Sequence, residues 1–266
     1  MAFYDHLKGK QALIAAHRGH RAIRPENTMS AFETALGDCD FIELDVGFSK
    51  DGVAVIIHDD SCKRTSNIEL FEEFKNKSNV NDLTYDELLQ LDFGSWFIKE
   101  DPFESIKNNV VSIDEIRTQQ IPTLKQVLQF CKKHALLVNV EIKDLSKTQF
   151  HKTAVHDIIE IILNEKIEDL VLISSFNHDY LKEAKQIAPY IQRAALQEKK
   201  HPKNLIKYLK KLDVVAYNSE DEIITQEVVQ SLKEANIFVN VYTVNSKKRK
   251  EELYDLGVDA IFTDCL

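Results

Sequence analysis

The stretch FIELDVGFSKDGVAVIIHDD, residues 41–60, consists of two apolar strand segments joined by a turn, with acidic side chains inside the first segment. Glu43 and Asp45 interrupt that segment, and the second segment ends at His58. Burying an unpaired carboxylate is costly, so both acids need partners from elsewhere in the chain. Because side chains alternate between the two faces of a strand, Glu43 and Asp45 share one face. In a closed barrel this acidic face points into the lumen, while the aliphatic face packs under the helices.

The pair Asp51-Gly52 predicts a two-residue hairpin turn between the two segments. Such a turn places Asp45 directly opposite His58, and opposed residues lie on the same face of a hairpin. We therefore expect His58 to fold back over the carboxylates, an arrangement that a shift of one residue would break.

Short apolar runs alternate with amphipathic helical patterns along most of the chain. The predicted strands span residues 12–17, 41–46, 136–143, 170–176, 191–196, 213–218, 237–244 and 259–264. Alternating strands and helices indicate a parallel sheet, and eight such units in about 250 residues predict an α/β fold, a (β/α)8 TIM-type barrel. A doubly wound open sheet is the alternative, but no glycine-rich nucleotide-binding motif follows the first strand.

Two segments fall outside this alternation. Residues 53–59 are expected to form an extra β-hairpin strand after the second barrel strand, and residues 60–120 a polar and aromatic insertion. An insertion of this length is more often functional or a small subdomain than a bare loop, and a lid without chemistry is the alternative. We expect a single barrel domain over residues 1–266. The insertion is where an interface of a homo-oligomer would be sought.

The composition of the 266-residue chain restricts its partners and its location. A net charge of −9 argues against a nucleic-acid-binding protein, because phosphate affinity needs a basic surface, but it allows one local cationic pocket. The four cysteines include no CxxC pair, which favours free thiols in a reducing compartment. The first residues lack the apolar core of a signal peptide, and no stretch reaches the ~18 apolar residues of a membrane span. We therefore expect a cytoplasmic protein.

Polar side chains also end other predicted strands. The segment VNVEIKD, residues 138–144, places Glu141 and Lys143 on one face, and the first strand ends in His17 and Arg18. The carboxyl ends of barrel strands meet at one mouth, so these groups are expected to converge there. The converging groups are three carboxylates (Glu43, Asp45, Glu141), two histidines (His17, His58) and two cations (Arg18, Lys143).

This combination of side chains suits metal-assisted phosphoryl transfer. Carboxylate oxygens favour Mg²⁺ or Ca²⁺ over Zn²⁺. Two histidines beside such a cation suit a general acid and a general base, and Arg and Lys suit an anionic phosphate group. The alternative is a buried ionic network in which the carboxylates pair with Arg18 and Lys143 and no metal binds.

These residues lie within segments that resemble the glycerophosphodiester phosphodiesterase family. The specific part of the resemblance is in AHRG (16–19), RPENTMSAFETAL (24–36) and DFIELDVGFSKDGVAVIIHDDSCKRTS (40–66). The later matches, in the family's order, are LDFGSWF (91–97), IPTLKQVL (121–128), VNVEIK (138–143), SSF (174–176), VYTVN (241–245) and GVDAIFTD (257–264). The resemblance therefore covers nearly the whole chain.

The resemblance implies a (β/α)8 barrel with a small insertion and hydrolysis of small glycerophosphodiesters to glycerol 3-phosphate and an alcohol. It also implies one divalent cation, Mg²⁺ or Ca²⁺. Matched residue by residue, it assigns acid/base catalysis to His17 and His58, metal binding to Glu43, Asp45 and Glu141, and phosphate contacts to Arg18 and Lys143.

Three further positions match the family less directly. Glu26 and Asn27 resemble its pocket-supporting pair. Glu26 would lie near the metal, and Asn27 would either support the pocket or cap the first helix. Tyr242 stands where the family commonly has Trp, on the alcohol side of the pocket.

Two other functions are compatible with the same residues. A lysophospholipase D-like enzyme would use the same metal and histidines and would need an apolar groove for an acyl chain. Phe93, Trp96 and Phe97 would line that groove or form the insertion's own core, and we favour the core. A non-catalytic barrel that binds metal or phosphodiester is the other alternative, although all seven chemical positions are filled.

Overall fold

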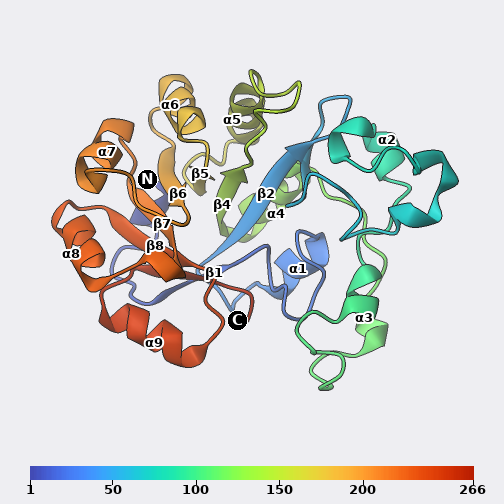
Figure 1. Cartoon of the computed structure of the whole chain (residues 1–266), viewed down its shortest axis with the longest axis horizontal. Coiled ribbons are helices and arrows are strands. Elements are labelled where there is room, and N and C mark those ends of the chain that lie inside the picture. The colour runs from blue at the N-terminus through green and yellow to red at the C-terminus, as the bar shows by residue number, and fades with distance from the viewer.

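Eight parallel strands close into a barrel in the computed structural model, which describes residues 1–266 (Figure 1). The ring closes because β1 pairs with both β2 and β9. The barrel strands are β1 (Leu13–Ala16), β2 (Phe41–Phe48), β4 (Leu137–Ile142), β5 (Val171–Ser175), β6 (Gln192–Gln197), β7 (Ala216–Glu220), β8 (Phe238–Tyr242) and β9 (Ala260–Thr263). The predicted barrel is confirmed, and the open-sheet alternative is wrong.

Helices cover the outside of the barrel (Figure 1). They are α1 (Met29–Thr34), α4 (Leu124–His134), α5 (Ala154–Glu165), α6 (His178–Ile187), α7 (Leu205–Leu212), α8 (Gln226–Glu234) and α9 (Lys247–Asp255). Outward strand residues such as Ile42 and Leu44 are fully buried in one core with helix residues such as Leu128 and Ile158. The aliphatic face predicted for residues 41–46 is therefore the face that binds the helices. No helix has the length and apolar character needed to span a membrane.

The N-terminal segment covers one end of the barrel. The short 3-10 helix η1 (Phe3–Asp5) places its rings against inward side chains at the first residue of two strands. Phe3 lies edge-on to Phe41 with ring centroids 5.3 Å apart, and Tyr4 stacks on Phe238 at 3.8 Å. This apolar plug is at the amino ends of the strands, and the polar cavity described below is at the carboxyl ends.

The extra strand β3 (Ala54–Ile56) pairs antiparallel with β2, but the predicted register is wrong by one residue. The observed pairing puts Ile57 rather than His58 opposite Asp45, and the Ile57 N–H donates to the Asp45 carbonyl (2.9 Å). Strand β3 ends before His58, and the chain then turns, so the His58 side chain still reaches the mouth of the barrel.

The register differs because the hairpin loop holds three residues, 50–52, instead of two. The Ser49 N–H donates to the Val53 carbonyl (3.0 Å), and the Val53 N–H donates to Ser49 Oγ (3.0 Å). Gly52 has a φ of 85°, which suits the left-handed last position of a three-residue loop.

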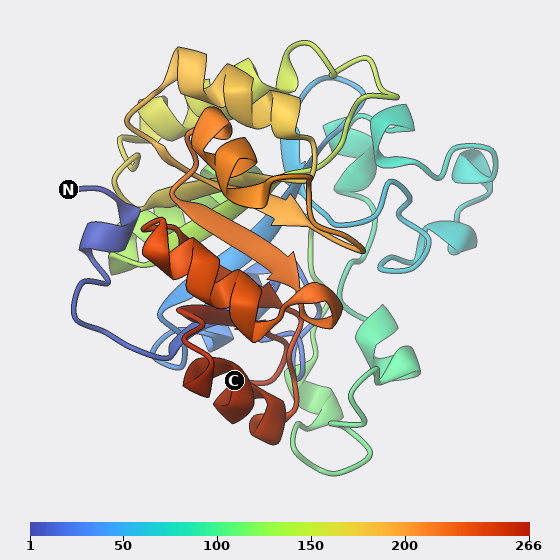
Figure 2. The same ribbon diagram turned by 60° about the vertical axis from the view of Figure 1, so that its left-hand side comes forward.

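Residues 60–120 form a lobe beside the barrel (Figure 2). Its short helices are η2 (Ile68–Leu70), η3 (Glu72–Phe74), η4 (Val80–Asp82), α2 (Tyr85–Leu88), α3 (Trp96–Glu100) and η5 (Ile113–Glu115). One more short helix, η6 (Asp221–Ile223), lies outside the lobe and follows β7. Phe93 and Phe97 are buried in the lobe's own apolar clusters, and Trp96 packs beside Phe97. None of these three rings lines the main cavity, so the core role is confirmed and the groove role is wrong.

Candidate active site

Three buried carboxylates meet at the carboxyl end of the barrel. Glu43 and Asp45 come from β2 and Glu141 from β4, and Asp45 is in register with Glu141. Each carboxylate has an oxygen within 4.8 Å of the other two. The inward direction expected from strand alternation is therefore what the structure has.

The pKa values of Glu43 and Asp45 shift in opposite directions. Burial, together with the neighbouring Asp45 and Glu141, raises the pKa of Glu43 well above its usual value. Burial also opposes ionisation of Asp45, but Lys143 and Arg18 outweigh it and hold the pKa of Asp45 below its usual range. The three carboxylates together can carry more negative charge than Arg18 and Lys143 neutralise.

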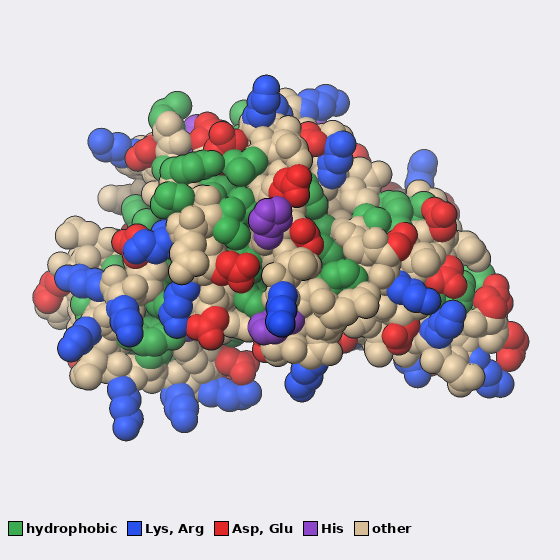
Figure 3. All heavy atoms as spheres, turned by 90° about the horizontal axis from the view of Figure 1, so that it is seen from above, with side chains coloured by type: hydrophobic (Ala, Val, Ile, Leu, Met, Phe, Trp, Pro, Cys, Tyr) green, Lys and Arg blue, Asp and Glu red, His purple; other side chains and the backbone are tan.

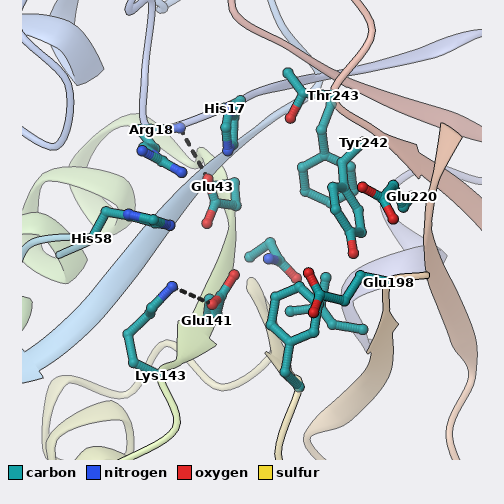
Figure 4. A pocket seen from close by; sticks show the side chains of 14 residues that line it. His17, Arg18, Glu43, His58, Glu141, Lys143, Glu198, Glu220, Tyr242 and Thr243 are labelled. Atoms are coloured by element: carbon teal, nitrogen blue, oxygen red, sulfur yellow. Dashed lines mark hydrogen bonds and ion pairs between the residues drawn. The ribbon is translucent and has the colours of Figure 1, made fainter. Parts of the chain in front are cut away.

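Both predicted cations contact this cluster (Figure 4). Lys143 Nζ lies 2.9 Å from Glu141 Oε1 and 3.4 Å from Asp45 Oδ1. Arg18 Nε lies 3.3 Å from Asp45 Oδ2, and the Arg18 backbone N–H donates to Glu43 Oε2 (3.0 Å). The carboxylates therefore pair with Arg18 and Lys143, as in the ionic network considered from the sequence.

The turn after β1 positions Arg18 for these contacts. Arg18 and Gly19 have φ values of 56° and 82°, both in the left-handed region. A Cβ on Gly19 would lie 2.7 Å from the backbone of Ala31, so the turn also lets the chain pass close to α1. Glycine is the residue that meets both requirements.

Each of the two histidines is paired with a carboxylate. His17 Nδ1 lies 2.8 Å from Asp264 Oδ1, and His58 Nδ1 lies 2.7 Å from Asp59 Oδ1. A carboxylate partner favours a proton on Nδ1, so Nε2 is the nitrogen left for other chemistry. Burial lowers the pKa of His17, although Asp264 opposes that shift. Both rings line the same cavity, on either side of Glu43 (Figure 4).

A chain of ion pairs connects the two histidine–carboxylate pairs. Arg21 contacts Asp264 (3.2 Å) and Glu26 (2.9 Å), while Arg64 contacts Glu26 (2.7 Å) and Asp59 (2.6 Å). Burial opposes ionisation of Glu26, but Arg64 and the other arginines outweigh it and lower the pKa of Glu26 to about 2. The structure therefore places Glu26 among arginines rather than in the carboxylate cluster.

Asn27 contacts the carboxylate cluster and does not cap the first helix. Its Nδ2 donates to Asp45 Oδ2 (2.9 Å), which fixes one of the clustered carboxylates. The N-cap of α1 is Thr28, whose side chain accepts from the Ala31 N–H. The capping role expected for Asn27 is wrong by one residue, and the pocket-supporting role agrees with the contact.

A cavity of about 520 Å³ connects this cluster to a second group of side chains. On the far side lie Phe176 after β5, Glu198 after β6, Glu220 at the end of β7 and Tyr242 at the end of β8. The predicted residues His17, Arg18, Glu43, His58, Glu141, Lys143 and Tyr242 all line it.

Sequence reasoning missed several of these residues. It did not single out Asp264, Arg64, Glu198 or Glu220. A signal was available for the two glutamates, because each lies two residues beyond the end of a predicted strand. Glu198 follows the inward Leu196, and Glu220 follows the strand 213–218. Extending each predicted strand by two residues would have found both. Asp264 ends the predicted strand 259–264, but its contact with His17, 247 residues away, follows only once the last strand is paired with the first.

The donor set of the carboxylate cluster fits a hard divalent cation. Its three side chains, from Glu43, Asp45 and Glu141, offer oxygen atoms close together, whereas zinc sites usually use nitrogen and sulfur. Burial and then repulsion from Asp45 and Glu141 raise the pKa of Glu43, and a bound cation would relieve that repulsion.

Comparison with known sequences agrees with this geometry. The profile described as the glycerophosphoryl diester phosphodiesterase family matches residues 17–266. A glycerophosphodiester phosphodiesterase of Bacillus altitudinis is 34% identical over 257 residues, covering 94% of each chain. Its counterpart in Caldanaerobacter subterraneus subsp. tengcongensis is 32% identical over 258 residues, covering 96% of this chain and 94% of that protein.

Solved structures share the fold. A putative glycerophosphoryl diester phosphodiesterase from Silicibacter pomeroyi superposes with a TM-score of 0.85 at 21% identity, covering 98% of this chain and 93% of the other. A phosphodiesterase from Oleispira antarctica, solved with the product sn-glycerol-3-phosphate, gives 0.77 at 26% identity, covering 96% and 93%.

Proposed function

The chain belongs to the glycerophosphoryl diester phosphodiesterase family and is an enzyme of that family, and on this premise we propose how it hydrolyses glycerophosphodiesters. The proposed products are glycerol 3-phosphate and an alcohol, formed with one divalent cation and two histidines. The observation that carries the proposal is the cluster of three buried carboxylates beside two carboxylate-paired histidines. The product held by the Oleispira antarctica phosphodiesterase supports the choice of glycerol 3-phosphate.

We assign Mg²⁺ or Ca²⁺ to Glu43, Asp45 and Glu141. When bound, the cation would neutralise charge on the phosphate oxygens as the phosphorus is attacked. Arg18 and Lys143 line the same part of the cavity and would bind the remaining phosphate oxygens, since both are held close to the cluster. Their positive charge would also stabilise the charge that develops in the transition state.

The two histidines would move the protons. We assign the general base to His17, because burial lowers its pKa and keeps the ring neutral near pH 7. Its Nε2 would take a proton from the nucleophile. If water attacks, glycerol 3-phosphate forms directly; if the neighbouring glycerol hydroxyl attacks, a cyclic phosphate forms, and a water molecule then opens it to glycerol 3-phosphate. His58 would donate a proton to the leaving alcohol oxygen. Asp264 and Asp59 would hold the two rings in the required orientation.

The first test is release of glycerol 3-phosphate from glycerophosphocholine with Mg²⁺, with Ca²⁺ and with EDTA. We expect release with at least one cation and none with EDTA. His17→Ala and His58→Ala should each lower kcat by ~10²–10⁴-fold, on the usual scale of general acid–base catalysis. His156→Ala, at an exposed position on α5, serves as the control. Near-normal turnover in both active-site variants, or release that EDTA does not affect, would contradict the proposal.

A further inference from the structure

The side of the cavity opposite the carboxylate cluster has a chemistry of its own. It is formed by Phe176, Glu198, Glu220 and Tyr242, which we call the acidic–aromatic wall. In the close view, Glu198, Glu220 and Tyr242 lie across the cavity from His58 and Lys143 (Figure 4). None of the four belongs to the proposed metal site or to the two histidine pairs.

The aromatic part of this wall is held in place. The Tyr242 hydroxyl donates to the Gln197 carbonyl (2.9 Å), which fixes the ring and occupies its one donor. Phe176 meets it edge to face, with ring centroids 6.0 Å apart, and remains 39% exposed at the mouth. A fixed aromatic face attracts a cation that comes within ~6 Å of the ring centre.

The polar part of the wall offers negative charge and hydrogen-bond acceptors. The two cations lining the cavity, Arg18 and Lys143, are both engaged with the carboxylate cluster on the opposite side. Asn139 also borders the cavity; its Oδ1 is buried and has no hydrogen-bond partner, while its Nδ2 donates to Ser174 Oγ. Such a lining calls for a ligand that is positively charged or donates hydrogen bonds.

Lys199 is the basic residue nearest the two glutamates of the wall. Its Nζ lies 2.8 Å from Glu198 Oε1, and its backbone N–H donates to Glu220 Oε2 (2.9 Å). The Lys199 side chain is 80% exposed, and an ion pair this exposed is weak. A cationic ligand entering the cavity can therefore replace that contact.

The negative field of the wall acts on Tyr242 itself. Burial, followed by Glu220, Glu141 and Glu198, raises the pKa of Tyr242. The cavity has two differently charged sides, with Arg18 and Lys143 beside the histidines and, beside the aromatic rings, two glutamates whose basic partner is the exposed Lys199.

We propose that the acidic–aromatic wall selects glycerophosphodiesters whose alcohol is a cationic amino alcohol, such as choline or ethanolamine. This inference rests on the proposed function, because it assumes that the phosphate binds between the carboxylate cluster, Arg18 and Lys143. A zwitterionic substrate then matches the cavity in charge, with its phosphate on one side and its ammonium group over Tyr242 and Phe176.

The test compares glycerophosphocholine with its uncharged carbon isostere, the 3,3-dimethylbutyl ester of glycerol 3-phosphate. The two substrates have the same shape and differ only in the positive charge. We expect kcat/KM to be higher for glycerophosphocholine by ~10-fold or more, the size of a favourable cation–π and carboxylate contact. Equal values for the two substrates in the native enzyme would overturn the inference while leaving the proposed function intact.

A double variant, Glu198→Gln with Glu220→Gln, locates the source of the preference. We expect the ratio of the two kcat/KM values to fall several-fold, because the negative charge is lost, and to keep only the smaller preference that the aromatic rings support. Glu234→Gln, a matched change on the exposed part of α8, should keep the native ratio. A ratio that persists in the double variant would overturn the role assigned to Glu198 and Glu220. If neither substrate is hydrolysed with any cation, the proposed function fails, and this inference fails with it.

Discussion

At the scale of single residues, the carboxylates beside the two histidines decide which ring nitrogen faces the cavity. Asp264 holds Nδ1 of His17, and Asp59 holds Nδ1 of His58. Asp264 itself is ionised in the folded protein, since His17 and Arg21 outweigh burial and lower the pKa of Asp264 to about 2. The ring of His17 is therefore oriented by a permanent negative charge.

Replacing Asp264 tests this positioning role. Asp264→Asn should lower kcat by ~10–100-fold, because partners of this kind orient a functional histidine. The negative charge of Asp264 raises the pKa of His17, so its loss should lower that pKa further and move the acid limb of the kcat/KM profile to lower pH. The measurement is kcat/KM against pH for the native enzyme and the variant.

The control for this experiment is Asp255→Asn, which removes an exposed carboxylate near the end of α9. It should change neither kcat nor the pH profile. If Asp264→Asn lowers kcat but leaves the acid limb where it is, Asp264 has a structural role and does not position the general base.

The residues that bear chemistry differ in how far the sequence can predict them. Glu43, Asp45 and Glu141 follow from strand alternation, because each interrupts an apolar run at an inward position. The contact of Glu26 with Arg64, 38 residues away, depends on how the insertion packs against the first turn of the barrel. Local patterns carry no information on such a contact.

At the scale of elements, the β2–β3 hairpin shows that an Asp-Gly pair predicts a turn but not the number of residues in it. An Asp-Gly pair suits a two-residue loop, but a glycine with positive φ also ends a three-residue loop. Here Ser49 decides between them, since its Oγ accepts from Val53 N–H and donates to Asp51. The strand and its partner were predictable from the sequence, but the register was not.

Two glycines separate the cost of backbone strain from the cost of a steric clash. Gly52 and Gly19 have similar φ values, 85° and 82°, but an added Cβ at Gly52 has its nearest neighbour at 3.8 Å, whereas at Gly19 it meets Ala31 at 2.7 Å. Gly52→Ala should therefore lower the free energy of unfolding by ~1 kcal/mol, the cost of positive φ alone. Gly19→Ala should lower it by clearly more. Urea unfolding of both variants measures the difference, and equal losses would contradict it.

At the scale of the whole molecule, the barrel was predictable because its pattern repeats. Eight apolar runs separated by helical patterns leave few alternatives for a chain of this length. The N-terminal plug was not predictable, because Tyr4 contacts Gln192 and Asn240, 188 and 236 residues away. Acidic and basic side chains are interspersed over the face seen from above (Figure 3). Inside the cavity, in contrast, the cations Arg18 and Lys143 lie on one side and the acidic–aromatic wall lies on the other.

The buried carboxylates predict that a divalent cation stabilises the whole fold. Glu43 and Asp45 lie on β2 and Glu141 on the adjacent β4, so a cation held by them would tie two neighbouring barrel strands. A ligand that binds only the folded state at 100 times its Kd adds ~2.7 kcal/mol to the free energy of unfolding. We therefore expect Mg²⁺ or Ca²⁺ to raise the Tm of the native protein above its value in EDTA. The variant Glu43→Gln with Glu141→Gln should lose this response, and an equal rise in both proteins would place the bound cation elsewhere.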